Sequence, residues 1–372
     1  MDADPVTATT AEQLTPIVRR ALDRPDADID RWELAPADHC VDNMTTERLD
    51  RVRGTLDDGT PWSLFAKTLQ PASAAPHWRL IPDFAHAELL RELDWRDEPR
   101  AYGCGLAADV PDGLRMPRLW HLDEDDDRIV LWLEDVDDRA VWDLPTYRRA
   151  AEGLGRLAGR WPQRRVDAEL GLRRRRLAEY VDGKVVHAVL PWLADDATWS
   201  DPMVAAATAS DPDLRSDLAR LADDLPDLLG RLDESDHALG HGDATPANIL
   251  DDGTDLVLVD WSYGSSMAVG TDLAQLVAGA YDGRAEGDVG LMTPVHDIVV
   301  DAYCAGLAAE GAPVAPGDVV LAYLVTLAVR SGLTAVDLSH VADLPEERRA
   351  ALLHQRVALA RLALDRLAAV RL

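Results

Sequence analysis

The segment from residue 241 to residue 261 carries side chains of the types that phosphoryl transfer needs. Asp243 lies in a short loop that contains a glycine, and Asn248 follows it by five residues. Asp260 ends an apolar run that is typical of a buried strand. In phosphoryl transfer one carboxylate accepts the proton of the attacking hydroxyl, and oxygen ligands hold Mg²⁺ against the triphosphate. The segment supplies two carboxylates and an amide for these tasks, although such a loop can also serve only as a turn.

Two rare residue types point to the same chemistry. Lysine occurs only at positions 67 and 184, whereas arginine occurs 36 times, and asparagine occurs only at positions 43 and 248. A lysine ammonium is a compact point charge and an arginine guanidinium is a wide fork, so the two do not substitute freely. We therefore expect a role for Lys67 and for Asn248, with chance survival as the alternative reading.

The elements that must position these residues follow a recognisable order. A short amphipathic helix is expected over 11–24, followed by three strands, a helical stretch and two further strands. Those strands span residues 29–35, 47–57, 61–69, 117–123 and 128–134, and the helices among them span 83–95 and 99–108. Later helices are expected at 145–160, 173–190, 214–234, 271–282, 289–310, 317–335 and 345–370, with short strands at 249–251 and 256–260. This order predicts an N-terminal lobe of residues 1–136 and a C-terminal lobe of residues 137–372.

The spacing H-x-D-x-x-x-x-N, followed by an aspartate at the end of a strand, is that of a kinase catalytic loop and its metal-binding segment. With it, the chain resembles the aminoglycoside phosphotransferase and choline kinase superfamily of small-molecule kinases. The residues that carry the resemblance are His241-Gly242-Asp243, Asn248 and Val259-Asp260-Trp261. The resemblance covers residues 29 to about 340, and it implies an α+β, two-lobed, protein-kinase-like fold with an antiparallel sheet in the first lobe.

The same resemblance implies roles for single residues. Asp243 would be the catalytic base, Asn248 and Asp260 would bind Mg²⁺, and His241 would hold the loop by hydrogen bonds. Asp272 matches a family aspartate that supports this loop. Its position at a helix start also suits an acidic residue without any further role.

In the N-terminal lobe, Lys67 stands where the family places the lysine that contacts the α- and β-phosphates of ATP. Its expected partner is Glu98, and Glu88 and Glu92 are the alternatives. Asn43 would lie in the loop between the first two strands, over the phosphates. The stretch from Trp132 through Glu134 to Val136 resembles the hinge between the lobes, whose backbone would bind adenine.

The interval after Asp260 narrows the class of acceptor. Only about ten residues separate Asp260 from the helix expected at Thr271. Protein kinases carry a long activation segment and an A-P-E sequence in that interval, and this chain has neither. A small hydroxylated molecule is therefore the expected acceptor, and within the family these include aminoglycosides and other antibiotics, amino sugars and choline.

Net charge, cysteine content and hydropathy limit the binding partners and the cellular compartment that the sequence predicts. The formal net charge of −29 argues against binding to nucleic acid or to anionic lipid, because both need a concentrated positive surface. It fits a neutral or cationic acceptor, or an acidic proteome. The three cysteines form no CxxC pair, and neither a signal sequence nor an apolar run of about 18 residues is present. A cytoplasmic protein is expected, with its oligomeric state open.

The leading hypothesis is an ATP- and Mg²⁺-dependent O-phosphotransferase acting on a small molecule. Two alternatives belong to other classes. One is a kinase fold that binds nucleotide without turnover, and the other is a metallophosphoesterase. Retention of Lys67, Asp243, Asn248 and Asp260 speaks against the first. The second would need further clusters of histidine and aspartate, whereas the remaining histidines are scattered along the chain.

Overall fold

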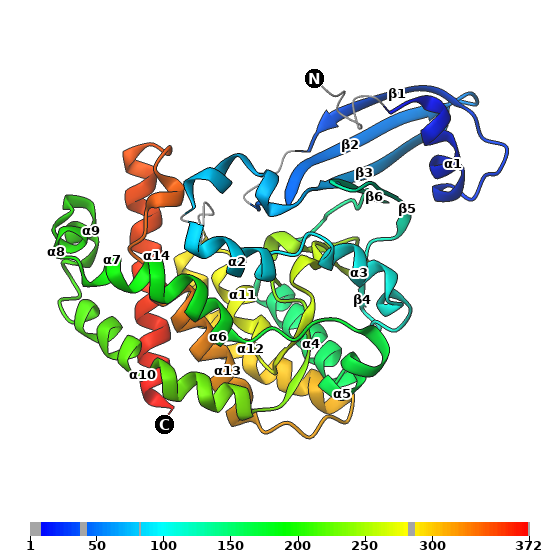
Figure 1. Cartoon of the computed structure of the whole chain (residues 1–372). Helices are drawn as coiled ribbons and strands as arrows, with labels where there is room; N and C mark the ends of the chain where they lie inside the picture. Colours follow the sequence, from blue (N-terminus) through cyan, green and yellow to red (C-terminus); the bar gives the residue numbers. More distant parts are fainter. Residues whose placement is uncertain (1–8, 38–42, 82, 282–286, 371–372) are drawn as a thin grey trace. The chain divides into compact units, whose positions relative to one another are not determined.

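The computed structural model describes residues 9–37, 43–81, 83–281 and 287–370 (Figure 1). The N-terminal segment considered for a signal sequence and Cys40 lie outside these ranges. Two compact units make up the chain. Unit 1 comprises residues 1–103 and 116–138, and unit 2 comprises residues 104–115 and 139–372. Within the described residues, no helix is both long enough and apolar enough to cross a membrane.

Unit 1 is built on a five-stranded antiparallel sheet in the order β1-β2-β3-β6-β5. The strands are β1 (Ile29–Pro36), β2 (Thr46–Leu56), β3 (Pro61–Leu69), β5 (Leu119–Glu124) and β6 (Ile129–Glu134). Strand β3 alternates between exposed and buried positions over its first half and is then buried through Leu69. Strand β6 lies between β3 and β5 and is almost wholly buried, as its continuous apolar run predicts.

Helices cover both faces of this sheet. Helix α1 (Ala11–Ala21) begins with a capping box between Thr10 and Gln13, and it buries Leu14, Ile17 and Val18. The residues that share a core with α1 include Val52, Leu64, Ala66 and Trp132. A second cluster contains Trp95, Leu69, Leu131 and Leu133. It lies beside α3 (Asp97–Gly103), which follows α2 (Asp83–Glu92).

Unit 2 is mainly helical. Helix α4 (Leu144–Arg160) and α12 (Val289–Ala309) lie side by side and approach closely at Gly155 and Gly306, where a side chain would collide with the opposite backbone (Figure 1). Helices α11 (Asp272–Ala278) and α13 (Pro316–Leu327) pack beside α12. The remaining helices are α5 (Gln163–Arg165), α6 (Leu177–Tyr180), α7 (Leu190–Ala194), α8 (Asp196–Ser200), α9 (Pro202–Thr208), α10 (Leu214–Glu234) and α14 (Glu346–Ala369).

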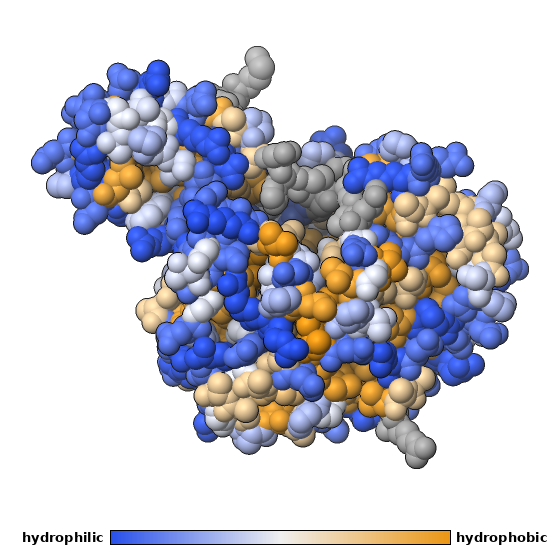
Figure 2. All heavy atoms as spheres, turned by 180° about the vertical axis from the view of Figure 1, so that it is seen from behind, coloured by the Kyte–Doolittle hydropathy of each residue, from blue (hydrophilic) through white to orange (hydrophobic). Residues whose placement is uncertain are grey.

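Two small sheets in unit 2 carry the segment that is rich in functional side chains. Strand β7 (His237–Gly240) pairs with β10 (Ser265–Ala268) in antiparallel fashion. Strand β8 (Ile249–Asp251) forms a hairpin with β9 (Leu256–Leu258), and β4 (Leu114–Arg115) runs parallel to β9. On the face seen in Figure 2, hydrophilic side chains dominate the surface of unit 1, as the strongly charged composition leads one to expect.

The structure corrects several predicted elements. Residues 173–176 do not begin a helix, because the backbone of Arg173 and Arg175 pairs with Ser266 of β10. The π-helical segment Val181–Val189 then follows α6. Strands β4, β7 and β10 and helices α8 and α9 were not predicted. Helix α3 begins at Asp97 and ends at Gly103, before the predicted limit of 108.

Candidate active site

In unit 1, Lys67 and Glu98 form a buried ion pair. The Lys67 ammonium lies 2.7 Å from Glu98 Oε2, and the two side chains are only 5% and 1% exposed. Strand β3 carries Lys67 on the opposite face from Ala66, and α3 carries Glu98. A buried ammonium requires a partner of this kind, because an uncompensated charge in an apolar environment is strongly unfavourable. The Glu88 side chain is not among those described.

Asn43 lies between β1 and β2, as predicted, but its side chain makes a local turn. Its Oδ1 accepts hydrogen bonds from the backbone N of Thr45 over 2.9 Å and from Thr45 Oγ1 over 2.8 Å. This arrangement is an Asx turn that starts β2. A contact between Asn43 and phosphate stays a prediction.

Trp132 and Glu134 are part of the sheet. The Trp132 ring is buried and donates from Nε1 to Asp123 Oδ2 over 2.8 Å, while its backbone lies between β3 and β5. The backbone N of Glu134 donates to the backbone oxygen of Arg118 over 2.9 Å. The backbone of the predicted hinge therefore leaves the sheet only after Glu134, and its contact with adenine stays a prediction.

In unit 2, β7 leads directly into the loop that carries Asp243. Gly242 follows with a φ of +79°, and a Cβ atom there would lie 2.5 Å from the backbone oxygen of Tyr263. A left-handed conformation and this close approach both require glycine. The loop is thereby pressed against the turn that follows Asp260.

His241 ties the loop to the end of β9. Its ring is fully buried and packs edge-on against Trp261, with the ring centres 4.8 Å apart. The backbone N of Asp243 donates to His241 Nδ1 over 3.3 Å, so that nitrogen carries no proton. Nε2 must then carry it, and it donates to the backbone oxygen of Val259 over 2.9 Å. His241 thus connects the Asp243 loop to the residue that precedes Asp260.

Asp272 holds the loop from the other side. As the first residue of α11, it accepts hydrogen bonds from the backbone N atoms of His241, over 2.9 Å, and of Gly242, over 2.8 Å. Burial raises the pKa of Asp272, and these two N–H groups and the nearby His241 oppose that rise. The carboxylate is therefore part of the loop structure.

Two amides orient the Asp243 carboxylate. Asn248 donates from Nδ2 to Asp243 Oδ2 over 2.8 Å and to the backbone oxygen of Asp243 over 2.9 Å. Gln275, on α11, donates from Nε2 to Asp243 Oδ1 over 3.0 Å. Each carboxylate oxygen thus has one donor and keeps further acceptor capacity, which a substrate hydroxyl can use.

Asn248 and Asp260 meet at one end of the β8–β9 hairpin. Ile249 pairs with Leu258, and the backbone N of Val259 donates to the backbone oxygen of Asn248 over 3.0 Å. Asp260 follows immediately, with a left-handed backbone at φ 59°. A non-glycine residue in this region costs about 1–3 kcal/mol, and such strain concentrates at functional sites.

The donor set at this end of the hairpin fits a hard divalent cation. Because the Asn248 NH₂ group faces two acceptors of Asp243, its Oδ1 is directed elsewhere and can serve as a ligand. Asp260 adds a carboxylate. An amide oxygen and a carboxylate without thiolate or paired imidazoles suit Mg²⁺.

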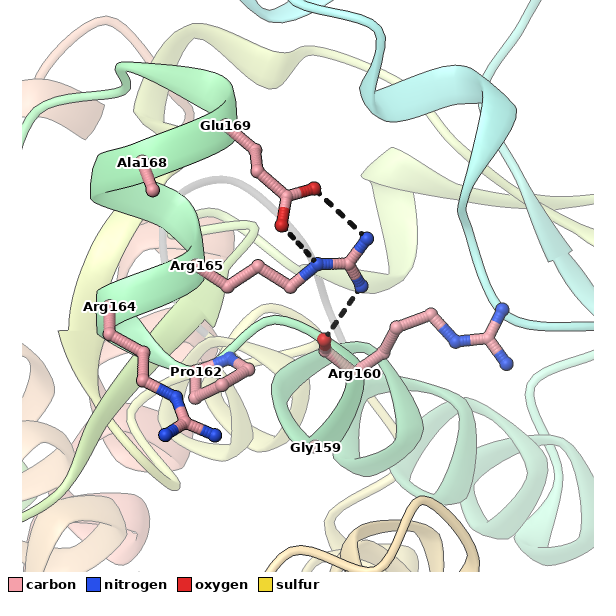
Figure 3. Close-up of a pocket in the computed structure, with 7 residues that line it drawn as sticks. All are labelled: Gly159, Arg160, Pro162, Arg164, Arg165, Ala168 and Glu169. Atoms are coloured by element: carbon pink, nitrogen blue, oxygen red, sulfur yellow. Dashed lines mark hydrogen bonds and ion pairs between the residues drawn. The ribbon is translucent and has the colours of Figure 1, made fainter.

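A separate hollow in unit 2 has a volume of about 520 Å³ and lies at the end of α4 (Figure 3). Its arginines already have protein partners in most cases. Arg165 pairs with Glu169 and Asp109, and Arg160 pairs with Glu310. This hollow adjoins the start of β7, whereas Asp243 follows the end of that strand.

Gln275 was missed in the sequence. It lies one helical turn after Asp272, in the otherwise apolar helix Asp272–Ala278. Residues three apart share a helix face, so a polar side chain at that spacing reaches the same loop. The three-residue spacing from Asp272 could therefore have identified Gln275 in the sequence.

Comparison with solved structures identifies proteins of similar architecture. An aminoglycoside phosphotransferase from Alicyclobacillus acidocaldarius shares 14% sequence identity over 92% of each chain, with a TM-score of 0.52. A spectinomycin phosphotransferase in complex with ADP and spectinomycin shares 13% identity over 95% of this chain and 98% of that chain, with a TM-score of 0.49. A choline kinase from Cryptosporidium parvum shares 10% identity over 91% of this chain and 89% of that chain, with a TM-score of 0.47. No family model and no curated protein matches the sequence.

The predicted fold class is confirmed. The chain combines an N-terminal antiparallel sheet with a mainly helical C-terminal region, and it shares this architecture with the Alicyclobacillus phosphotransferase. At 14% identity the similarity establishes the fold, while chemistry must be argued from the residues themselves.

Proposed function

We propose that this protein transfers the γ-phosphoryl group of ATP to a hydroxyl of a small molecule. The observation that carries the proposal is the Asp243 carboxylate, which Asn248 and Gln275 hold in one orientation. A general base must be fixed within hydrogen-bond reach of the proton that it accepts. The name of the solved structure from Alicyclobacillus acidocaldarius, an aminoglycoside phosphotransferase, agrees with this class of reaction.

Each functional side chain has a task in the proposed reaction. Asp243 accepts the proton of the acceptor hydroxyl as that oxygen bonds to the γ-phosphorus, while the bond from the γ-phosphorus to the β,γ-bridging oxygen breaks and ADP leaves. Lys67 binds phosphate oxygens, and Glu98 keeps its ammonium group in place. Asn248 and Asp260 would hold Mg²⁺, which would supply positive charge to the phosphate oxygens. His241 and Asp272 keep the loop in shape.

The proposal is tested by measuring ATP consumption and acceptor phosphorylation with a panel of hydroxylated compounds. We expect both to rise together with one class of acceptor and to require Mg²⁺. Titratable nucleotide binding without phosphorylation of any acceptor would favour the catalytically silent alternative. Release of inorganic phosphate from monoesters without ATP would favour a phosphoesterase.

The metal site gives a graded prediction. We expect Asp260→Ala to lower turnover more than Asn248→Ala, because a charged ligand contributes more to Mg²⁺ binding than a neutral amide does. Chelators should inhibit the wild-type protein, excess Mg²⁺ should reverse the inhibition, and Mn²⁺ should substitute. Turnover across a Mg²⁺ titration measures all of these effects.

A matched control lies on the same hairpin. Asp255 precedes β9, whereas Asp260 follows that strand. Asp255→Asn removes a similar charge and should leave the Mg²⁺ dependence unchanged. An active Asp260→Ala variant, or activity supported by Zn²⁺ alone, would contradict the metal assignment.

Gln275 is a positioning residue in this proposal. We expect Gln275→Leu to lower kcat by about 10- to 100-fold, the effect of losing one hydrogen bond to a charged group. The KM for ATP should change little, since Gln275 contacts the carboxylate of Asp243. Steady-state kinetics of Gln275→Leu and Gln275→Asn separate the two parameters. If Gln275→Leu lowers kcat/KM only by raising KM and leaves kcat unchanged, the result would contradict a positioning role for Gln275.

A further inference from the structure

A basic group adjoins the proposed site, although acidic residues outnumber basic ones by 67 to 38. Arg175 donates from Nη2 to the backbone oxygen of Ser262 over 3.2 Å, and its guanidinium carbon lies 4.8 Å from the centre of the Tyr263 ring. The pairing of its backbone with Ser266 of β10 fixes its position. Because Ser262 and Tyr263 lie two and three residues after Asp260, Arg175 contacts the turn that follows the proposed metal-binding residue.

Two more cations, Lys184 and Arg330, lie over the ring of Tyr180. Tyr180 is the last residue of α6, which begins at Leu177. The Arg330 guanidinium carbon lies 5.1 Å from the centre of the Tyr180 ring, and Lys184 Nζ lies 5.7 Å from it. Neither cation forms an ion pair with a carboxylate in the part of the chain that the structure describes. Lys184 is exposed and stays hydrated, so the lack of a carboxylate partner matters for Arg330, which is half-buried.

Among Arg175, Lys184 and Arg330, an anionic ligand would stabilise Arg330 the most. It follows helix α13, whose residues from Leu321 to Leu327 are all buried, and it is itself half-buried. A cation that loses water without gaining an ion-pair partner is unfavourable. An anion bound at this position would supply the missing partner, and a guanidinium binds carboxylate or phosphate through two parallel hydrogen bonds.

Arg330 and Arg175 lie within electrostatic range of Tyr263, beside the proposed site. Burial raises the pKa of Tyr263, and the charges of Arg330 and Arg175 oppose this rise, while Asp243 and Asp260 add to it. The Tyr263 hydroxyl is therefore within electrostatic range of both arginines, of the proposed base Asp243 and of the proposed metal ligand Asp260. Gly242, beside Asp243, is also in contact with Tyr263.

We propose that the acceptor carries an anionic group, a carboxylate or a phosphate, and that Arg330 binds this group with Lys184 and Arg175 close by. This inference rests on the proposed function and narrows its substrate class. It departs from the expectation of a neutral or cationic acceptor, which was drawn from the net charge. Charges beyond a Debye length of about 8 Å are largely screened at physiological salt, so groups that contact the ligand decide specificity.

The test uses matched acceptors that differ in one charged group. Glucuronate, glucose 6-phosphate, glucose and glucosamine form one set, and glycerate, glycerol 3-phosphate, glycerol and 3-aminopropane-1,2-diol form another. They are screened with a wider panel of hydroxylated compounds sorted by charge, with ATP and Mg²⁺. We expect turnover among anionic acceptors, and the two anionic arms distinguish carboxylate from phosphate.

The decisive variant is Arg330→Gln. We expect it to lower the ratio of kcat/KM for an anionic acceptor to that for its neutral analogue by about 10- to 100-fold, the effect of one charge-assisted contact. Arg164→Gln is the matched control, because Arg164 is an exposed arginine on α5 without an ion-pair partner in the described part of the chain. It should leave the ratio unchanged.

The other outcomes overturn the inference in distinguishable ways. Turnover confined to neutral or cationic acceptors, or an unchanged ratio in Arg330→Gln, refutes an anionic acceptor and leaves the kinase proposal intact. A rise in the KM for ATP that is the same with every acceptor assigns Arg330 to the nucleotide instead. Absence of turnover with every class of acceptor overturns the proposed function, and the inference falls with it.

Discussion

Asp243→Asn is expected to lower kcat by about 10²–10⁴-fold, which is the usual contribution of a positioned general base. Asparagine has nearly the same size as aspartate, and it cannot accept the proton of the acceptor hydroxyl. Asn248 can still donate to the remaining oxygen, and Gln275 can rotate its amide to accept from the new NH₂ group. The fold and the binding of nucleotide should therefore persist.

Two measurements separate the loss of the base from the loss of the loop. The melting temperature of Asp243→Asn should stay close to that of the wild-type protein, and nucleotide titration should give a similar affinity. Asp255→Asn, in the turn of the β8–β9 hairpin, controls for the removal of one negative charge. Near-wild-type turnover of Asp243→Asn on a true acceptor would exclude Asp243 from the proposed role.

Elements with strong local patterns could be predicted from the sequence. The alternation of buried and exposed residues along the first half of β3 and the leucine spacing of α10 follow from burial of one face. The predicted ranges of β2, β3 and α10 agree with the structure within a few residues. The catalytic-loop spacing also belongs to this class, since H-x-D-x-x-x-x-N is local in sequence.

Elements that depend on distant partners could not be predicted. Strands β7 and β10 have four residues each, all buried, so neither shows the alternation that identifies a strand. The arginine run 173–176 has a helical composition, but pairing with Ser266 holds its backbone extended. Tertiary hydrogen bonds outweigh the small differences in helix propensity at such positions.

The residues of the proposed site also fall into those that the sequence predicts and those that only the folded chain brings to the site. Asp243, Asn248 and Asp260 were predicted from their spacing, whereas Gln275 reaches Asp243 from helix α11. Arg330 carries no signal in the sequence, because it is one of 36 arginines. Its significance arises only when folding places it over Tyr180 without a carboxylate partner in the described residues.

Lys67 should show two separable effects, one on stability and one on activity. Lys67→Met leaves Glu98 as a buried carboxylate without its cation, and breaking a buried pair in this way costs about 3–5 kcal/mol of unfolding free energy. The double variant Lys67→Met/Glu98→Met replaces both charges by apolar groups, and such replacements are often neutral or stabilising. We therefore expect the double variant to recover most of the lost stability, as measured by chemical denaturation.

Activity should not recover with stability. Lys67 supplies the charge that the proposed reaction needs at the phosphates, and loss of one such group costs about 10²–10³-fold in rate. Lys67→Arg should also fail to restore turnover, because a wide guanidinium does not fit where a compact ammonium lies 2.7 Å from Glu98. Kinetics with varied ATP on all three variants measure this effect. If the double variant regains both stability and turnover, or if Lys67→Arg is fully active, Lys67 has only a structural role in unit 1.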